Sequence, residues 1–388
     1  MYELIWLLLP VAAASGWMLA KRSQKTNKKS PCFDVSSDYF KGLNYLLNEQ
    51  PDKAIEVFIR MVEVDNDTAE THLALGSLFR RRGEVDRAIR IHQNLIARPT
   101  LNYEQKHHAL MELGQDYMKA GLLDRAENLF QELMENKSRV AESLIHLIDI
   151  YQQEQDWEKA IEASIQYEQH TGNRYGHVIA HYCCEMGEKA QQEGDQQQFN
   201  ECMKQAFVYD RNCVRANIML AQREKKAGLY PEAIAHFEKV IDVDVDYLPE
   251  IIQAMQECFE RMDMDTAMES MLDKIMDHYD GITPLLVKAD ILLNNGNDRQ
   301  AMQLMVDKLK QRPSVRGLKW LVEHNLNRSE GRAYENLTIL KDLIDSLLQD
   351  KPVYECQECG FKGKSMHWQC PGCKQWNRVK PIKGIEAE

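Results

Sequence analysis

Apolar and polar residues follow one another along most of this chain with the spacing of amphipathic helices, and a small residue recurs at one helical position. The recurring positions lie 34, 38, 34, 39, 34, 34 and 34 residues apart. A chance succession of helices would not keep one residue type in this register, so the pattern predicts a repeat of about 34 residues. The recurring residues are Ala54, Ala88, Ala126, Ala160, Phe199, Ala233, Ala267 and Ala301.

Two more positions keep the same register. Twelve residues before the recurring position, six of the eight units have glycine or alanine; four residues after it, three units have phenylalanine. Small residues let two helices approach closely, and aromatic rings fill the space beside the contact. Each unit is therefore expected to be an antiparallel helix pair whose apolar face only a neighbouring pair can bury. These residues are Gly42, Gly76, Gly114, Gly187, Ala221 and Ala289, with Phe58, Phe130 and Phe237.

This period and this order of small and aromatic residues resemble the tetratricopeptide repeat. The resemblance implies an all-α superhelix over residues 35–313, with about eight units, that offers a curved surface to other proteins. Residues 314–350 read as one further helix pair that caps the array. A repeat array supplies no catalytic groups, and the sequence contains no HExxH motif and no GxSxG motif. We therefore expect a binding protein and not an enzyme.

An uncharged run of 17 residues, Leu4 to Ala20, precedes the repeats. As a helix it would rise about 25 Å, which is within the range for crossing a bilayer. Five basic residues follow the run, from Lys21 to Lys29, and none precedes it. A cleaved signal peptide, the alternative, has its basic residues before the apolar run. Residues 1–20 are therefore predicted to be a transmembrane anchor and residues 21–34 a basic juxtamembrane linker, with the remaining chain in the cytoplasm.

The net charge of −12 is unevenly distributed along the chain. Residues 1–30 contain five basic residues and Glu3, which leaves −16 for the rest. An acidic body disfavours binding to nucleic acid, because phosphate neutralisation needs clustered Lys and Arg. Residues 352–383 alone carry +4, six basic residues against two acidic ones. A nucleic-acid-binding zinc ribbon therefore stays a weaker alternative.

The strongest local motif is a pair of CxxC sequences near the C-terminus, Cys356-x-x-Cys359 and Cys370-x-x-Cys373. Four thiolates in a tetrahedron bind Zn²⁺ or iron, and the sequence does not decide between the two metals. Gly360 and Gly372 are expected to allow the tight turn of each knuckle. Residues 352–383 are therefore predicted to be a Cys₄ module that holds one ion and docks on the last helices. Two disulfides are the alternative, which a reducing compartment disfavours.

The second knuckle, Cys370-Pro371-Gly372-Cys373, resembles that of rubredoxin, although the loop between the pairs is short and resembles zinc ribbons as closely. A filled Cys₄ site has no open coordination position, so the metal is expected to be structural or at most a one-electron centre. His177, His181 and Cys184 are near one another in sequence. We interpret them as residues of a packed amphipathic helix and not as a second metal site.

The anchor ELIWLLLPVAAASGW, the stretch GEVDRAIRIHQNL (residues 83–95) and the tail with its two CxxC pairs resemble the lipopolysaccharide assembly protein B (LapB) family of Gram-negative bacteria. The resemblance covers essentially the whole chain. It implies a single-pass protein of the bacterial inner membrane that regulates lipopolysaccharide (lipid A) synthesis.

By the same resemblance the partners are the membrane protease FtsH, the deacetylase LpxC, whose degradation the family promotes, and other lipopolysaccharide synthesis or transport proteins. The metal ligands would be Cys356, Cys359, Cys370 and Cys373, and no catalytic residue is implied. No nucleic acid is expected as a partner, and a homodimer stays open. A redox or metal-state sensor built on the Cys₄ centre is the alternative function.

Overall fold

The structure is a computed structural model that describes residue 18 and residues 35–48, 50–64 and 69–385. Apart from Met18, the predicted anchor lies outside the described residues, as does the whole juxtamembrane linker of residues 21–34. Across the part of the chain that is described, none of the helices has both the length and the apolar character needed to cross a membrane.

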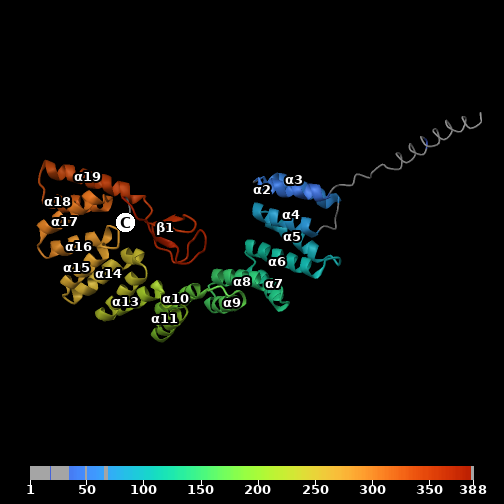
Figure 1. Cartoon of the computed structure of the whole chain (residues 1–388), viewed down its shortest axis with the longest axis horizontal. Coiled ribbons are helices and arrows are strands. Elements are labelled where there is room, and N and C mark those ends of the chain that lie inside the picture. Colours follow the sequence, from blue (N-terminus) through green and yellow to red (C-terminus); the bar gives the residue numbers. More distant parts are fainter. Residues whose placement is uncertain (1–17, 19–34, 49, 65–68, 386–388) are drawn as a thin grey trace, which may run out of the picture. The chain divides into compact units, whose positions relative to one another are not determined.

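Helices make up most of the described chain, and from α2 to α17 they follow one another as eight antiparallel pairs (Figure 1). The prediction of a mostly helical tetratricopeptide-repeat superhelix with a small C-terminal cysteine ribbon is confirmed. The helices are α2 (Val35–Leu47), α3 (Pro51–Val64), α4 (Ala69–Arg82), α5 (Val85–Ile96), α6 (Tyr103–Lys119), α7 (Leu123–Glu135), α8 (Val140–Glu154), α9 (Trp157–Thr171), α10 (Gly176–Glu193), α11 (Gln196–Tyr209), α12 (Val214–Lys226), α13 (Tyr230–Val243), the 3₁₀ turn η1 (Val245–Tyr247), α14 (Leu248–Arg261), α15 (Asp265–Met276), α16 (Thr283–Asn294), α17 (Asp298–Gln311), α18 (Val315–Leu326) and α19 (Arg332–Gln349).

The chain divides into two compact units, Met1–Ile150 and Tyr151–Glu388, which we call unit 1 and unit 2. The boundary falls inside α8. In unit 1 the recurring glycines have the role that the sequence predicts. A Cβ atom added to Gly42 would come within 2.6 Å of the Phe58 ring, and one added to Gly114 within 2.6 Å of the Phe130 ring. The two helices of each pair therefore touch at a glycine that is pressed against an aromatic face.

The second helix pair of unit 1 replaces that aromatic residue with a buried polar network. His92 lies against Gly76 where its neighbours have phenylalanine. Its Nδ1–H donates to the Asp116 carboxylate at 2.5 Å, and both side chains are fully buried. Arg80 donates to Asp116 at 2.8 Å and to Glu112 at 2.8 Å, so two carboxylates share one guanidinium. This network joins α4, α5 and α6.

One helix pair of unit 2, α10 with α11, has a softer contact at the same repeat positions, although α13 keeps Phe237 there. Gly187 of α10 meets the terminal methyl of Met203 of α11, and a Cβ atom there would lie 2.5 Å from it. Cys183 and Cys184 are both fully buried in the core around these helices. The predicted small and apolar residues therefore do form the core, but a flexible methionine takes the place of the aromatic ring.

The last helix pair, α18 and α19, carries the predicted apolar stripes, but only part of each is covered. Val322 and Ile344 are buried. Several other members of the stripes face solvent among the described residues, namely Leu318, Leu340, Leu343 and Leu347. A capping pair needs a polar outer face, so this pair does not have the surface of a typical cap.

The C-terminal module consists of three short strands, β1 (Tyr354–Cys356), β2 (Lys362–Gly363) and β3 (Val379–Pro381). They form an antiparallel sheet in the order β2-β1-β3. Tyr354 pairs with Gly363 on one side and with Pro381 on the other. The first CxxC sequence therefore connects β1 to β2, and the second lies between β2 and β3.

Candidate metal centre

The two CxxC knuckles have matching backbone turns. In the first, the N–H of Gly360 donates to the Cys356 carbonyl at 2.9 Å; in the second, the N–H of Lys374 donates to the Cys370 carbonyl at 2.9 Å. Both donors have positive φ, +73° for Gly360 and +61° for Lys374. Gly360 is the left-handed residue of the first turn, whereas Lys374 has that conformation in the second turn, where Gly372 instead directs its N–H at the Cys370 sulfur.

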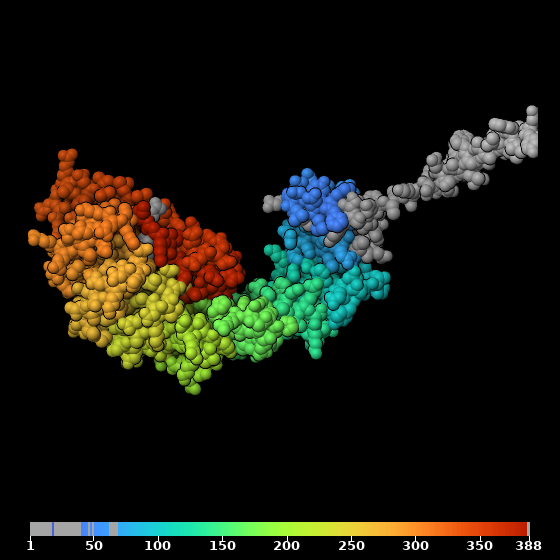
Figure 2. All heavy atoms as spheres, viewed as in Figure 1, coloured from blue at the N-terminus to red at the C-terminus, as the bar shows by residue number. Residues whose placement is uncertain are grey.

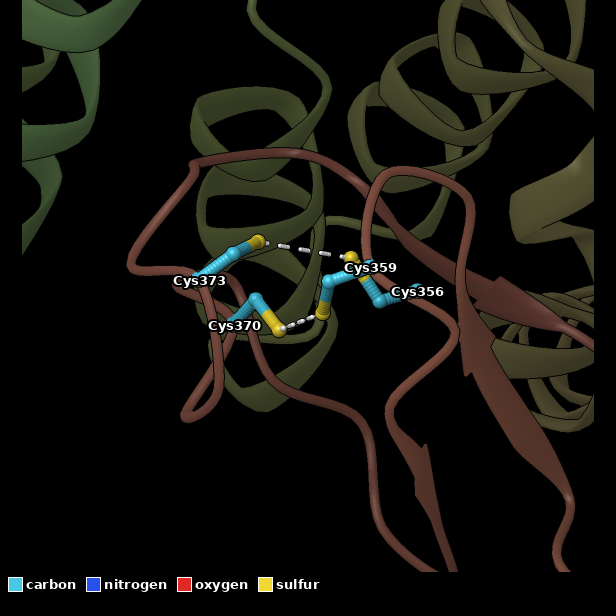
Figure 3. A group of neighbouring side chains, drawn as sticks. All are labelled: Cys356, Cys359, Cys370 and Cys373. Carbon is cyan, nitrogen blue, oxygen red and sulfur yellow. Dashed lines mark hydrogen bonds between the residues drawn. The ribbon is translucent and has the colours of Figure 1, made fainter. Parts of the chain in front are cut away.

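All four predicted cysteines come together (Figure 3), and their sulfur atoms lie within 4.8 Å of one another. The Sγ atoms of Cys356 and Cys373 are 3.7 Å apart, and those of Cys359 and Cys370 are 3.6 Å apart. A tetrahedral ion with metal–sulfur bonds of 2.3 Å requires sulfur–sulfur distances of about 3.8 Å. The separations fit one ion and are far longer than a disulfide bond of about 2.05 Å. The four thiols are free cysteines.

Backbone N–H groups point at the Cys370 sulfur and favour its thiolate form. Burial alone would raise the pKa of the Cys370 thiol, but the N–H groups of Cys373 and Gly372, together with the neighbouring thiols, lower that pKa to about 7. Cys356 and Cys370 are buried, whereas Cys359 is exposed. One edge of the centre therefore reaches solvent while the other is covered by protein.

The module is held against the repeats of unit 2 mainly by Trp376. Its indole stacks on the His181 ring of α10, with ring centres 5.0 Å apart, and meets Tyr182 and Trp157 edge to face. Its Nε1–H donates to the Gln152 side chain at 3.0 Å, and Gln369 donates to the same oxygen at 2.9 Å. The indole is buried and its single donor is satisfied, which is the arrangement that a buried tryptophan requires.

A second set of contacts lies on η1 and α14. Trp368 stacks on Tyr247 with ring centres 5.3 Å apart. Lys380 pairs with Asp244, and its ammonium lies 3.8 Å from the centre of the Tyr247 ring. Burial raises the pKa of the Tyr247 phenol, so this side chain stays neutral and hydrogen-bonds to Asn377. Figure 2 shows the atoms of the module, in red, against the yellow-green helices of the same unit.

The expected docking of the module on the last helices is therefore wrong. Apart from a backbone bond between Val315 and Ile385 and a lysine contact at the end of α19, the described contacts fall on α8 to α15. The observed aromatic partners of Trp376 and Trp368, which include His181 and Tyr247, lie on those repeats. The sequence predicts that the aromatics of the module pack, but it does not indicate which repeats receive them.

His181 packs against Trp376 and Trp368 in this arrangement, in agreement with its interpretation as a packing residue. Burial, assisted by the nearby charge of Arg215, lowers the pKa of His181 to about 3. The neutral ring is therefore a flat stacking partner for Trp376. Among the described residues, Cys356, Cys359, Cys370 and Cys373 are the one group of histidine, cysteine and acidic side chains whose ligand atoms converge.

The fold and the four-sulfur site together define a class: a tetratricopeptide-repeat protein with a C-terminal rubredoxin-type metal module. The family described as tetratricopeptide repeat matches residues 71–102 and 111–172. The family described as rubredoxin metal binding domain matches residues 354–381. The module thus fits one cysteine-coordinated metal ion.

Two curated relatives then identify the family. Lipopolysaccharide assembly protein B of Escherichia coli (strain K12) is 36% identical over 388 residues, which covers 100% of both chains. Its counterpart in Haemophilus influenzae is 31% identical over 395 residues, again with 100% of each chain covered. The chain belongs to the lipopolysaccharide assembly protein B family.

Proposed function

We propose that this protein is a membrane-tethered scaffold and adaptor that regulates lipopolysaccharide assembly. The observation that carries the proposal is the full-length similarity to lipopolysaccharide assembly protein B, which includes the predicted anchor, the repeats and the metal module. In its specific form, the protein brings the deacetylase LpxC to the membrane protease FtsH and so promotes LpxC degradation. It also gathers other lipopolysaccharide synthesis or transport proteins.

The architecture supports binding and not chemistry. Stacked helix pairs present extended surfaces to other proteins. In unit 2, the metal module itself covers part of the repeat surface, around His181 and Tyr247. In this proposal the ion is structural: the four thiolates hold the two knuckles, and the knuckles hold Trp376 and Trp368 in position against the repeats.

Tethering is the physical basis of the proposed regulation. Residues 1–20 would hold the repeats at the cytoplasmic face of the inner membrane, where the protease is also embedded. Restricting two proteins to one surface raises their effective concentration without any new contact. An adaptor of modest affinity then controls the lifetime of its client.

The test compares three forms at native expression in cells that lack their own copy. They are the full chain, residues 21–388 alone, and residues 21–388 behind an unrelated single-pass anchor of the same orientation. We expect the full chain and the exchanged anchor to shorten the half-life of LpxC, and residues 21–388 alone to leave it long. The half-life is followed by immunoblot after translation is stopped, with a strain lacking FtsH activity as the control.

If residues 21–388 alone restore the normal LpxC half-life, tethering is not the mechanism. If all three forms leave LpxC unchanged while lipopolysaccharide assembly depends on the protein, the proteolytic role is wrong and only the broader role remains.

A redox or metal-state sensor is the second candidate, and the exposure of Cys359 favours it because an exposed ligand gives electrons a short path to solvent. Iron in the site would absorb visible light and give a reversible one-electron wave. A colourless protein that contains one zinc ion per chain would end this candidate.

A further inference from the structure

One cavity in the described residues lies in unit 2, away from the metal module. Its volume is about 920 Å³, and it opens between α13 and α15 beside the end of α14. Figure 1 shows α13 and α15 on the outer side of unit 2, whereas the module ribbon lies on the inner side. The cavity therefore opens on a different side of unit 2 from the docked module, and binding there does not require the proposed tethering.

Both walls of the cavity have the spacing of a helix-packing seam. On α13 the lining residues Ile234, Glu238 and Ile241 are 4 and 3 residues apart; on α15 the lining residues Ala267, Met271 and Ile275 are 4 and 4 residues apart. Such spacing places side chains on one face of a helix, where they pack into a neighbouring helix. Both helices pack on α14, yet no helix of the described chain fills the space between these two rows of side chains.

The floor of the cavity is apolar and adaptable. Phe259 of α14 is buried at the base, and Met262 and Met271 are partly exposed beside it. Methionine is unbranched and polarizable, so it adapts to irregular apolar surfaces. Along α13 the lined face from Pro231 to Asp242 is about 17 Å long at 1.5 Å per residue. This length matches about three turns of a helix.

The two rims carry opposite charge. Glu238 and Asp242 stand on the α13 rim and Lys274 stands on the α15 rim. All three are exposed, and within the described part of the chain none forms an ion pair. Uncompensated charges of opposite sign on either side of an apolar floor suit a ligand that is itself apolar below and charged on both flanks. An acyl chain has no such flanks.

We propose that the groove between α13 and α15 binds an amphipathic helix of a partner protein. That helix inserts an apolar stripe with i, i+4, i+7 spacing between the two seams, as in other helix-in-groove complexes. Its basic flank lies along Glu238 and Asp242, and its acidic flank lies along Lys274. The bound helix completes a layer that α13 and α15 leave open.

The probes are three stapled helical peptides of about 16 residues, since short unstapled helices are marginal in water. All carry the same leucine and methionine stripe. The mixed peptide has lysine on one flank and glutamate on the other. The all-lysine peptide has lysine on both flanks, and the all-glutamate peptide has glutamate on both. Binding to the full chain in detergent is measured by fluorescence anisotropy, and we expect the mixed peptide to bind best.

Two sets of variants then assign the site. Met271→Glu should weaken binding of the mixed peptide by roughly tenfold or more, whereas Val208→Glu, an exposed apolar position on α11, should leave it unchanged. Lys274→Glu makes both rims acidic and should move the preference to the all-lysine peptide. Lys239→Glu, the same charge change on another face of α13, should not. Melting curves verify that each variant is folded.

The inference is overturned if the three peptides bind equally, or if Met271→Glu has no effect in a folded protein. It is also overturned if oleate binds the groove at one molecule per chain while no peptide does. A dimer of the full chain that Met271→Glu dissociates would instead make a second copy the occupant. None of these outcomes depends on LpxC or FtsH, so failure here leaves the proposed function standing.

Discussion

Units 1 and 2 build the same helix-pair repeat with different means. Unit 1 presses Gly42 and Gly114 against the rigid rings of Phe58 and Phe130. Unit 2 presses Gly187 against the flexible end of Met203 and receives a metal-bound module on its repeats. From this difference we expect repeats near the consensus to hold themselves together and the degenerate repeats of unit 2 to depend on the docked module.

Losing the metal should have the largest effect, and only on unit 2. Without an ion the four thiols no longer fix the knuckles, because structural Cys₄ modules fold on their metal. We expect Cys370→Ser with Cys373→Ser to release the module. Hydrogen exchange should then rise strongly in α10 and α14, while α4 and α6 keep the protection of the unaltered protein.

Equal loss of protection in both units would contradict this comparison, because it would mean that unit 1 also depends on the module. The matched control is Cys202→Ser together with Cys258→Ser, which changes two cysteines that are buried in repeat cores away from the metal centre.

Replacing the main docking residue should be the next largest effect. Trp376→Ala removes a stack, two edge-to-face contacts and a hydrogen bond from the module interface. Large-to-small changes of this kind cost about 3–5 kcal/mol. The loss in unfolding free energy is measured by urea unfolding, with hydrogen exchange in α10 as the readout. Trp320→Ala is the control, since that indole is half-exposed on α18, and it should cost clearly less.

The repeats and the sulfur site could be predicted because each depends on local spacing. Alanine register and CxxC spacing are visible in a single sequence, and the buried Ala88, Ala126 and Ala160 occupy the helix contacts as expected. The docking place of the module could not be predicted. It depends on Gln152, His181 and Tyr247, which are more than 100 residues from the module in sequence and belong to no motif.

The polar network of unit 1 was missed for a related reason. His92 occupies a position that has phenylalanine in two neighbouring pairs, so the sequence shows an interruption but not its partner. The partner, Asp116, is 24 residues away on α6 and looks like an ordinary polar helix residue. In the structure, Asp116 of the next helix pair supplies the hydrogen bond that the buried His92 ring needs.

Breaking this network should destabilise unit 1 in a way that depends on which partner is removed. Asp116→Ala leaves the buried His92 ring without its carboxylate and leaves Arg80 paired only with Glu112, and removing one member of a buried pair costs about 3–5 kcal/mol. His92→Phe restores the aromatic residue of the neighbouring pairs and leaves Asp116 bonded to Arg80. We expect this variant to cost far less, as measured by urea unfolding. Equal costs would mean that the network is not an ion-pair network.

Adding a methyl group at Gly114 and at Gly187 should show whether the packing of unit 1 is more rigid than that of unit 2. Gly114→Ala forces a methyl group toward the Phe130 ring, and overpacking of this kind costs about 1–3 kcal/mol. Gly187→Ala meets only the end of Met203, which can move aside. We expect a lower melting temperature for Gly114→Ala and little change for Gly187→Ala. If Gly187→Ala is the more damaging change, methionine does not soften the contact in unit 2.

The last expected effect is the part of the pH dependence that comes from His181 in unit 2. The pKa of His181 is about 3 in the folded chain and about 6.5 when the ring is free in the unfolded chain. Below pH 6.5 the unfolded state therefore binds a proton at His181 that the folded state does not bind. The unfolding free energy then falls by up to about 1.4 kcal/mol for each pH unit. His181→Phe keeps a ring beneath Trp376 but cannot titrate. The unfolding free energy of the variant should therefore fall less steeply between pH 6.5 and pH 5 than that of the unaltered protein, because its other titrating groups are shared and cancel in the difference. Parallel slopes would show that the His181 ring already accepts a proton while the module is docked, and the stack on Trp376 could then not require a neutral ring.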